Sequence, residues 1–206
     1  MIKYVIFDFD GTLADSTDVF VSAWNSLAKK YNFKEMQYED LDTLKKLSIK
    51  ERSKLLNFPM YKLPFIMPQL YKLFKQSLHE IRLIDGVREM LDQLEKRGYK
   101  IAVISSNSKE NILQFFEDNQ IDTISTVLCS SRIHGKDRLI NQFLKEHKLE
   151  TSEVIYVGDE QRDIVACHKT GVKIIWVGWG YDAAEVIKSV EPDYKVYSPD
   201  EILRVI

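Results

Sequence analysis

Apolar runs of strand length alternate with amphipathic stretches along most of this chain. The apolar runs, several of them rich in β-branched residues, predict buried strands at residues 4–7, 100–104, 126–129, 154–157, 173–177 and 193–197. Helical spacing of apolar residues and capping residues predict helices at 85–98, 108–119, 137–147, 163–170 and from 198 onward. Strands that alternate with helices predict an α/β fold with a parallel sheet covered on both faces.

Residues 17–82 break this alternation, because their patterns predict only helices. Helices are expected at residues 18–30, 38–47 and 64–81, and Ser48 with Glu51 forms a capping box that opens another. We therefore expect a core of residues 1–16 and 83–206, with a small helical domain of residues 17–82 inserted after the first strand. Joints that let this insert move are expected near Asp15 and near Gly86.

Composition narrows the classes of function. The chain has 206 residues, 45% hydrophobic residues and a net charge of −2, so one core with an insert is expected, and neither nucleic acid nor membrane is an expected partner. Cys129 and Cys167 form no disulfide framework, which favours a cytoplasmic location. No leader is expected before the first strand, no apolar run is long enough to span a bilayer, and a monomer or weak dimer is expected.

Acidic residues follow the first predicted strand. Asp8 and Asp10 are two residues apart and Gly11 comes next. The carboxyl ends of strands in a parallel sheet are where ligand sites usually form, and carboxylates this close repel one another unless a cation or a proton lies between them. Oxygen ligands suit a hard divalent cation such as Mg²⁺.

Further polar residues follow later strands. Ser105 directly follows the strand at 100–104 and precedes Ser106 and Asn107, and Lys136 lies at the start of a predicted helix after the next strand. The strand at 154–157 ends in Gly158-Asp159, with Asp163 one helical turn later on the same face. Each feature also has a structural reading: helix capping for Ser105 and Asp159, and a surface position for Lys136.

Together these residues resemble the motifs of the haloacid dehalogenase (HAD) superfamily. Asp8-Phe9-Asp10-Gly11-Thr12 is similar to its nucleophile motif, and Ser105, Lys136 and the Gly-Asp-x-x-x-Asp segment follow in the family's order. The resemblance implies a Rossmann-like core with a helical cap placed after the nucleophile strand. Within the family, the pattern most resembles phosphoglycolate phosphatase-like proteins.

The resemblance also implies roles for these residues. Asp8 is expected to attack phosphorus and form an aspartyl-phosphate, and Asp10 to act as the acid and base. Ser105 and Lys136 are expected to hold the transferring oxygens. The expected set of metal ligands for Mg²⁺ is Asp8, Asp10, Asp159 and Asp163. The remaining expected contacts to substrate are Gly11, Thr12, Ser106 and Asn107. The implied activity is a Mg²⁺-dependent phosphatase for a small phosphorylated metabolite, with 2-phosphoglycolate as one candidate.

Single residues separate this chain from other activities found in the superfamily. Dehalogenases lack the second aspartate, which is Asp10 here. Sugar phosphomutases of the β-phosphoglucomutase type carry a cap histidine where this chain has Phe20. A phosphate-binding regulatory protein without catalysis has no need of Asp10, so the presence of Asp10 favours an enzyme.

The insert contains a basic stretch between residues 45 and 75. Its cations are Lys45, Lys46, Lys50, Arg52, Lys54, Lys62, Lys72 and Lys75. They form either a solvated helical face or a surface that attracts an anionic substrate. In the second interpretation, Lys45 and Arg52 are candidate substrate contacts. His134, just before Gly135 and Lys136, is a further residue that could face the site.

Overall fold

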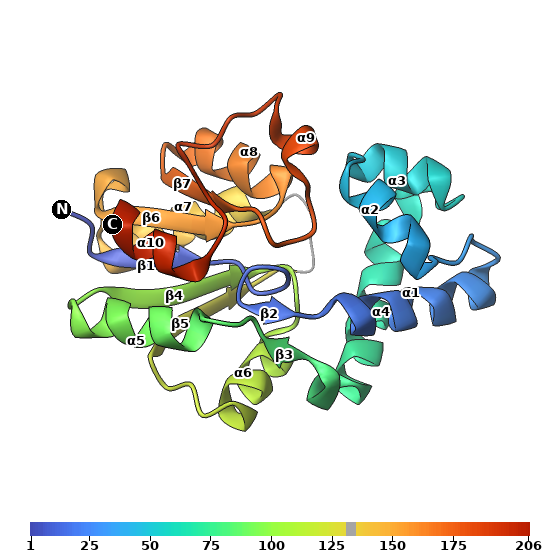
Figure 1. The fold of residues 1–206 in the computed structure, drawn as a ribbon, viewed down its shortest axis with the longest axis horizontal. Coiled ribbons are helices and arrows are strands. Elements are labelled where there is room, and N and C mark those ends of the chain that lie inside the picture. The colour runs from blue at the N-terminus through green and yellow to red at the C-terminus, as the bar shows by residue number, and fades with distance from the viewer. Residues whose placement is uncertain (131–134) are drawn as a thin grey trace.

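The computed structural model, which describes residues 1–130 and 135–206, has a parallel sheet at its centre (Figure 1). The sheet has six strands in the order β5-β4-β1-β6-β7-β8. The strands are β1 (Tyr4–Phe7), β4 (Lys100–Ser105), β5 (Ile124–Cys129), β6 (Val154–Gly158), β7 (Lys173–Val177) and β8 (Tyr194–Val196). The predicted α/β class is confirmed, and each predicted strand lies within two residues of its predicted bounds.

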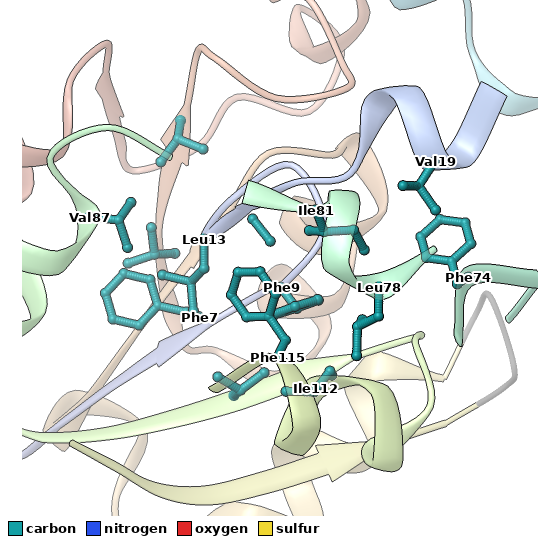
Figure 2. Close-up of a cluster of buried hydrophobic side chains, with 14 of the residues drawn as sticks. Phe7, Phe9, Leu13, Val19, Phe74, Leu78, Ile81, Val87, Ile112 and Phe115 are labelled. Carbon is teal, nitrogen blue, oxygen red and sulfur yellow. The ribbon is translucent and has the colours of Figure 1, made fainter. Parts of the chain in front are cut away.

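Helices cover both faces of the sheet, because alternate side chains of each strand point to opposite sides. Val5 and Phe7 of β1 pack with α5 (Val87–Lys96), α6 (Lys109–Asp118) and α10 (Pro199–Val205). Tyr4 and Ile6 pack with α7 (Lys136–His147), α8 (Gln161–Thr170) and the short α9 (Ala184–Ile187). Figure 2 shows the first cluster, in which Phe9 lies beside Phe115.

The segment between β2 (Ala14–Asp15) and β3 (Arg82–Leu83), here called the helical insert, lies to one side of the sheet (Figure 1). Its helices are α1 (Thr17–Tyr31), α2 (Leu41–Lys45), α3 (Ile49–Leu55) and α4 (Leu63–Gln76), with single turns η1 (Tyr38–Asp40), η2 (Met60–Lys62) and η3 (Leu78–Glu80). The capping box of Ser48 and Glu51 is present at the start of α3.

The connections between sheet and insert pair with each other, which the sequence analysis did not predict. β2 and β3 are antiparallel, with Ala14 opposite Leu83 and Asp15 opposite Arg82. The amide of Ile84 extends the pairing by donating to the carbonyl of Leu13. Strands of two residues have no side-chain period that a sequence pattern can reveal.

The described residues contain no helix long and apolar enough to cross a membrane. Cys129 and Cys167 are free thiols.

Candidate active site

The predicted site residues lie at the carboxyl ends of three neighbouring strands. β1 is paired with β4 on one side and with β6 on the other. Asp8 directly follows β1, Ser105 ends β4, and Asp159 directly follows β6. All three side chains are buried. The parallel register therefore brings together residues that are far apart along the chain.

Lys136 bridges two carboxylates inside this site. Its Nζ lies 2.5 Å from Asp8 Oδ2 and 2.5 Å from Asp163 Oδ1, and its side chain is only 3% exposed. Burial lowers the pKa of Lys136, but the charges of Asp163 and Asp8 outweigh it and hold this pKa above its ordinary value. The first turn of α7 is an unfavourable place for a cation, and these carboxylates compensate for it. Lys136 is therefore a fixed, buried positive charge beside Asp8.

Asp10 has a different environment from Asp8. Its Oδ1 accepts a hydrogen bond from Ser16 Oγ at 2.7 Å, and its Oδ2 accepts one from Asn107 Nδ2 at 2.9 Å. Ser16 Oγ also lies 2.7 Å from the hydroxyl of Tyr181. Burial raises the pKa of Asp10 to about 6 despite these hydrogen bonds. Asp10 can therefore hold a proton near neutral pH more readily than an ordinary aspartate.

Asp159 is held tightly by its neighbours. Its Oδ1 accepts from Thr12 Oγ1 at 2.9 Å, and its Oδ2 accepts from the amide of Tyr181 at 2.6 Å. Gly11 has a φ of +75°, and a Cβ there would lie 2.5 Å from Asp159 Oδ2. A Cβ on Gly180 would lie 2.2 Å from Asp159 Cβ. Only glycines allow the backbone to approach the carboxylate this closely.

Carboxyl oxygens of Asp8, Glu160 and Asp163 lie within 4.8 Å of one another. The predicted ligand set of Asp8, Asp10, Asp159 and Asp163 overlaps this cluster in Asp8 and Asp163, while Glu160 was not predicted. Burial, followed by the charges of Glu160, Asp8 and Asp163, raises the pKa of Asp159 well above its ordinary value. A divalent cation relieves crowding of this kind, and an all-oxygen set of donors suits Mg²⁺.

A partly buried arginine, also not predicted, completes the polar side of the site. Arg162 Nη1 donates to Ser106 Oγ at 2.9 Å and its Nε donates to Glu160 Oε2 at 2.6 Å. Burial lowers the pKa of Arg162, but the charges of Glu160 and the other nearby carboxylates outweigh this effect and hold the pKa above its ordinary value. Glu160 and Arg162 lie between the two aspartates of the Gly-Asp-x-x-x-Asp motif. The motif leaves these positions unspecified, so it did not predict that their side chains point into the site.

Ser105 and Asn107 are organised by the turn after β4. The amide of Asn107 donates to Ser105 Oγ at 3.1 Å. Asn107 Oδ1 in turn accepts from the amide of Ser108 at 2.7 Å and from Asn111 Nδ2 at 3.1 Å. These contacts orient the Asn107 amide so that its Nδ2 reaches Asp10.

A cavity of about 190 Å³ lies between this site and the helical insert, and Asp10, Arg162, Lys45 and Arg52 are among the residues that line it. Arg52 Nη2 lies 2.5 Å from Asp182 Oδ1 and also donates to the carbonyl of Tyr181 at 3.1 Å. The charge of Arg52 is therefore already paired. The Lys45 carbonyl accepts from the amide of Ala183, so the insert contacts the core here.

Phe20 of α1, which the sequence analysis set against the cap histidine of the mutases, also lines this cavity. Its ring packs against Phe74 and Tyr181. His134 lies outside the described residues.

Comparison with known proteins agrees with this geometry. Residues 5–177 match the family of haloacid dehalogenase-like hydrolases. A phosphoglycolate phosphatase from Synechococcus elongatus is 27% identical over 100% of this chain and 97% of its own length. The pyrophosphatase PpaX from Bacillus velezensis is 23% identical over 99% of this chain and 96% of its own.

Solved structures share the fold. A predicted phosphatase from Clostridium acetobutylicum superimposes with a TM-score of 0.84 at 22% identity, over 100% of this chain and 98% of that one. A haloacid dehalogenase-like hydrolase from Streptococcus pneumoniae gives a TM-score of 0.82 at 20% identity, over 99% and 98%. The resemblance that the sequence motifs suggested is confirmed: this chain belongs to the haloacid dehalogenase-like hydrolase family.

Proposed function

We propose that this protein is a Mg²⁺-dependent phosphatase that hydrolyses small phosphate monoesters through an aspartyl-phosphate on Asp8. One observation carries the proposal: Asp8 and Asp10 lie two residues apart, yet one contacts the ammonium of Lys136 and the other has a pKa raised to about 6. An anionic nucleophile beside a proton donor is what transfer of a phosphoryl group to a carboxylate requires.

In the first step, a carboxylate oxygen of Asp8 attacks phosphorus and the bond from phosphorus to the ester oxygen breaks. Asp10 donates its proton to the departing oxygen, which leaves as the alcohol. Lys136 stays close to Asp8 and offsets the negative charge that gathers on the phosphoryl oxygens. Ser105, at the end of β4, and Ser106, directly after it, are the proposed hydrogen-bond donors to these oxygens.

In the second step, water attacks the phosphorus of the aspartyl-phosphate. Asp10, now a carboxylate, accepts a proton from this water, and inorganic phosphate leaves as Asp8 is regenerated. Ser16 and Asn107 hold Asp10 in one orientation through both steps, since each donates to a different carboxylate oxygen. The same side chain therefore acts first as acid and then as base.

We propose Asp8, Glu160 and Asp163 as carboxylates that surround Mg²⁺, together with the carboxylate of Asp159 and the backbone carbonyl of Asp10 from the sequence analysis. The observation in favour is the closeness of the oxygens of Asp8, Glu160 and Asp163. When bound, the cation supplies positive charge that offsets repulsion between the Asp8 carboxylate and the anionic substrate.

The substrate we propose is a small phosphorylated metabolite that enters below the helical insert. Residues 17–82 are proposed to act as a cap that closes over the core of residues 1–16 and 83–206. The name of the Synechococcus relative makes 2-phosphoglycolate one candidate. We also propose a cytoplasmic location, which the two free cysteines favour.

Release of inorganic phosphate from p-nitrophenyl phosphate and from 2-phosphoglycolate tests this proposal. We expect turnover with Mg²⁺, its loss in excess EDTA, and its restoration by added Mg²⁺. Asp8→Asn is expected to lose several orders of magnitude in rate. Full activity in EDTA contradicts the metal assignment. Binding of phosphate esters without any turnover favours the non-catalytic alternative.

A further inference from the structure

The cavity beside the catalytic carboxylates is lined mainly by hydrocarbon. The core supplies Asp10, Glu160, Arg162 and Tyr181, and all the other lining residues come from the helical insert. Most of those are apolar, among them Trp24, Leu44, Phe58, Met67, Leu70 and Phe74. A lining of this composition favours an apolar ligand group. Such a group makes no hydrogen bonds to water, so it loses none when it enters the cavity.

The charged side chains of the insert leave the cavity lining mainly apolar. Among the described lining residues from the insert, only Lys45 and Arg52 are charged. Arg52 is bound to Asp182 and also donates to the carbonyls of Leu44 and Tyr181. An anionic substrate tail would have to compete with these partners for the Arg52 guanidinium. Most of the other side chains around such a tail would be apolar and could not bind its charge.

The position of Asp10 fixes which part of a substrate meets this wall. The argument rests on the proposed function, in which Asp10 protonates the ester oxygen that leaves. That oxygen must lie at Asp10, and Asp10 itself lines the cavity. The phosphoryl group stays with Asp8 and Lys136, so the alcohol part of the ester points toward the insert.

We propose that the preferred substrates are phosphate monoesters of apolar alcohols, whose hydrocarbon part fills this cavity. The cavity measures about 190 Å³. An apolar cavity of about 150 Å³ holds one benzene molecule, so the space fits a single aromatic ring or an alkyl chain of about six carbons. As a carboxylate oxygen of Asp8 bonds to phosphorus, the bond from phosphorus to the ester oxygen breaks, that oxygen takes the proton of Asp10, and the apolar alcohol leaves.

A series of straight-chain alkyl phosphates from methyl to hexyl tests this inference. The leaving oxygens in the series are chemically alike, so differences in kcat/KM report contacts of the chain. We expect kcat/KM to rise about fourfold for each added methylene until the cavity is full, the effect of moving one methylene out of water. We also expect 2-phosphoglycolate to be a poorer substrate than propyl or butyl phosphate.

Paired variants of α4 separate the cavity from general effects of polarity. Met67 lines the cavity, whereas Phe65 on the same helix is 73% exposed and does not line it. Met67→Gln is expected to reduce the ratio of hexyl to methyl phosphate turnover at least fourfold, and Phe65→Gln to leave the ratio unchanged. Leu41→Gln, at another partly buried lining position, is the second variant if Met67→Gln does not fold, as judged by circular dichroism.

The outcomes distinguish this inference from the proposed function. A rising series that flattens in Met67→Gln but not in Phe65→Gln supports the inference. A flat or falling series, with normal Mg²⁺-dependent turnover of methyl phosphate and 2-phosphoglycolate, overturns the inference and leaves the phosphatase proposal intact. Failure to hydrolyse any ester, p-nitrophenyl phosphate included, overturns both.

Discussion

At the residue scale, Asp8 and Asp10 show how two identical side chains on one turn acquire different chemistry. Asp8 meets the ammonium of Lys136, while Asp10 meets a hydroxyl and an amide. Both carboxylates lie just after β1, as the sequence predicted, because an apolar run that stops at charged residues indicates where a buried strand ends. It could not assign Ser16 and Tyr181, whose contact with each other depends on how the chain returns to the site.

Replacement of Asp10 by Asn tests its role as acid and base. We expect kcat for an alkyl phosphate to fall by about 10²–10⁴-fold, because the leaving alkoxide is no longer protonated. With p-nitrophenyl phosphate, whose leaving group needs little protonation, we expect a rapid burst of p-nitrophenol followed by slow turnover. Stopped-flow absorbance measures both phases. Near-normal kcat on the alkyl ester is incompatible with this role.

At the scale of elements, apolar runs and caps predicted nearly all helices and strands, and long-range contacts account for the rest. The helix expected at residues 64–81 ends instead at Gln76 and is followed by the turn η3. The pairing of β2 with β3 joins the places where hinges were expected, near Asp15 and before Gly86. Glu160 was overlooked because its direction depends on the N-terminal geometry of α8, where it is the capping residue.

The contact of α3 with the loop after β7 gives a prediction about Arg52 and Asp182. Asp182 is only 7% exposed in its side chain, and burial raises its pKa even with Arg52 beside it. Arg52→Met leaves this carboxyl without its cation, and we expect a loss of about 1–3 kcal/mol in the free energy of unfolding. Lys50→Met, at an exposed position on the same helix, is the control.

Urea unfolding measures the free energy of unfolding of Arg52→Met, of Lys50→Met and of the double variant Arg52→Met with Asp182→Asn. The double variant is expected to be more stable than the sum of the two single changes predicts. Each single change leaves one partner of the ion pair unpaired, whereas the double change removes both charges. Equal stability of Arg52→Met and Lys50→Met would show that the ion pair contributes nothing to holding the insert.

At the scale of the whole molecule, the site lies between the insert and the sheet, and both line its cavity. They are joined through the β2–β3 pair and again where Arg52 meets Asp182. The proposed closure of the insert over this site would exclude water and strengthen the electrostatic contacts inside it. The break in the alternation of strands and helices indicated a helical insert from the sequence alone. The apolar lining of the cavity could not be predicted, because it depends on the packing of helices that are distant along the chain.

Binding of Mg²⁺ is expected to stabilise the whole fold, since the carboxylates that surround it come together only in the folded chain. We expect the Tm to rise with Mg²⁺ concentration, and the rise to shrink in Glu160→Gln. Glu185→Gln, a change of the same kind on α9, is expected to respond like the original protein. Differential scanning fluorimetry makes the comparison. An equal rise in Glu160→Gln removes Glu160 from the proposed set.

The central claim is that Asp8 carries the phosphoryl group during turnover. The direct measurement is mass spectrometry of peptides from Asp10→Asn, quenched in acid during turnover of p-nitrophenyl phosphate with Mg²⁺. Loss of the general base slows breakdown of the intermediate, so we predict one added phosphoryl group on the peptide that contains Asp8, and its absence in Asp8→Asn. A phosphoryl group on another residue such as Ser105, or turnover with no covalent phosphate at all, would contradict the account.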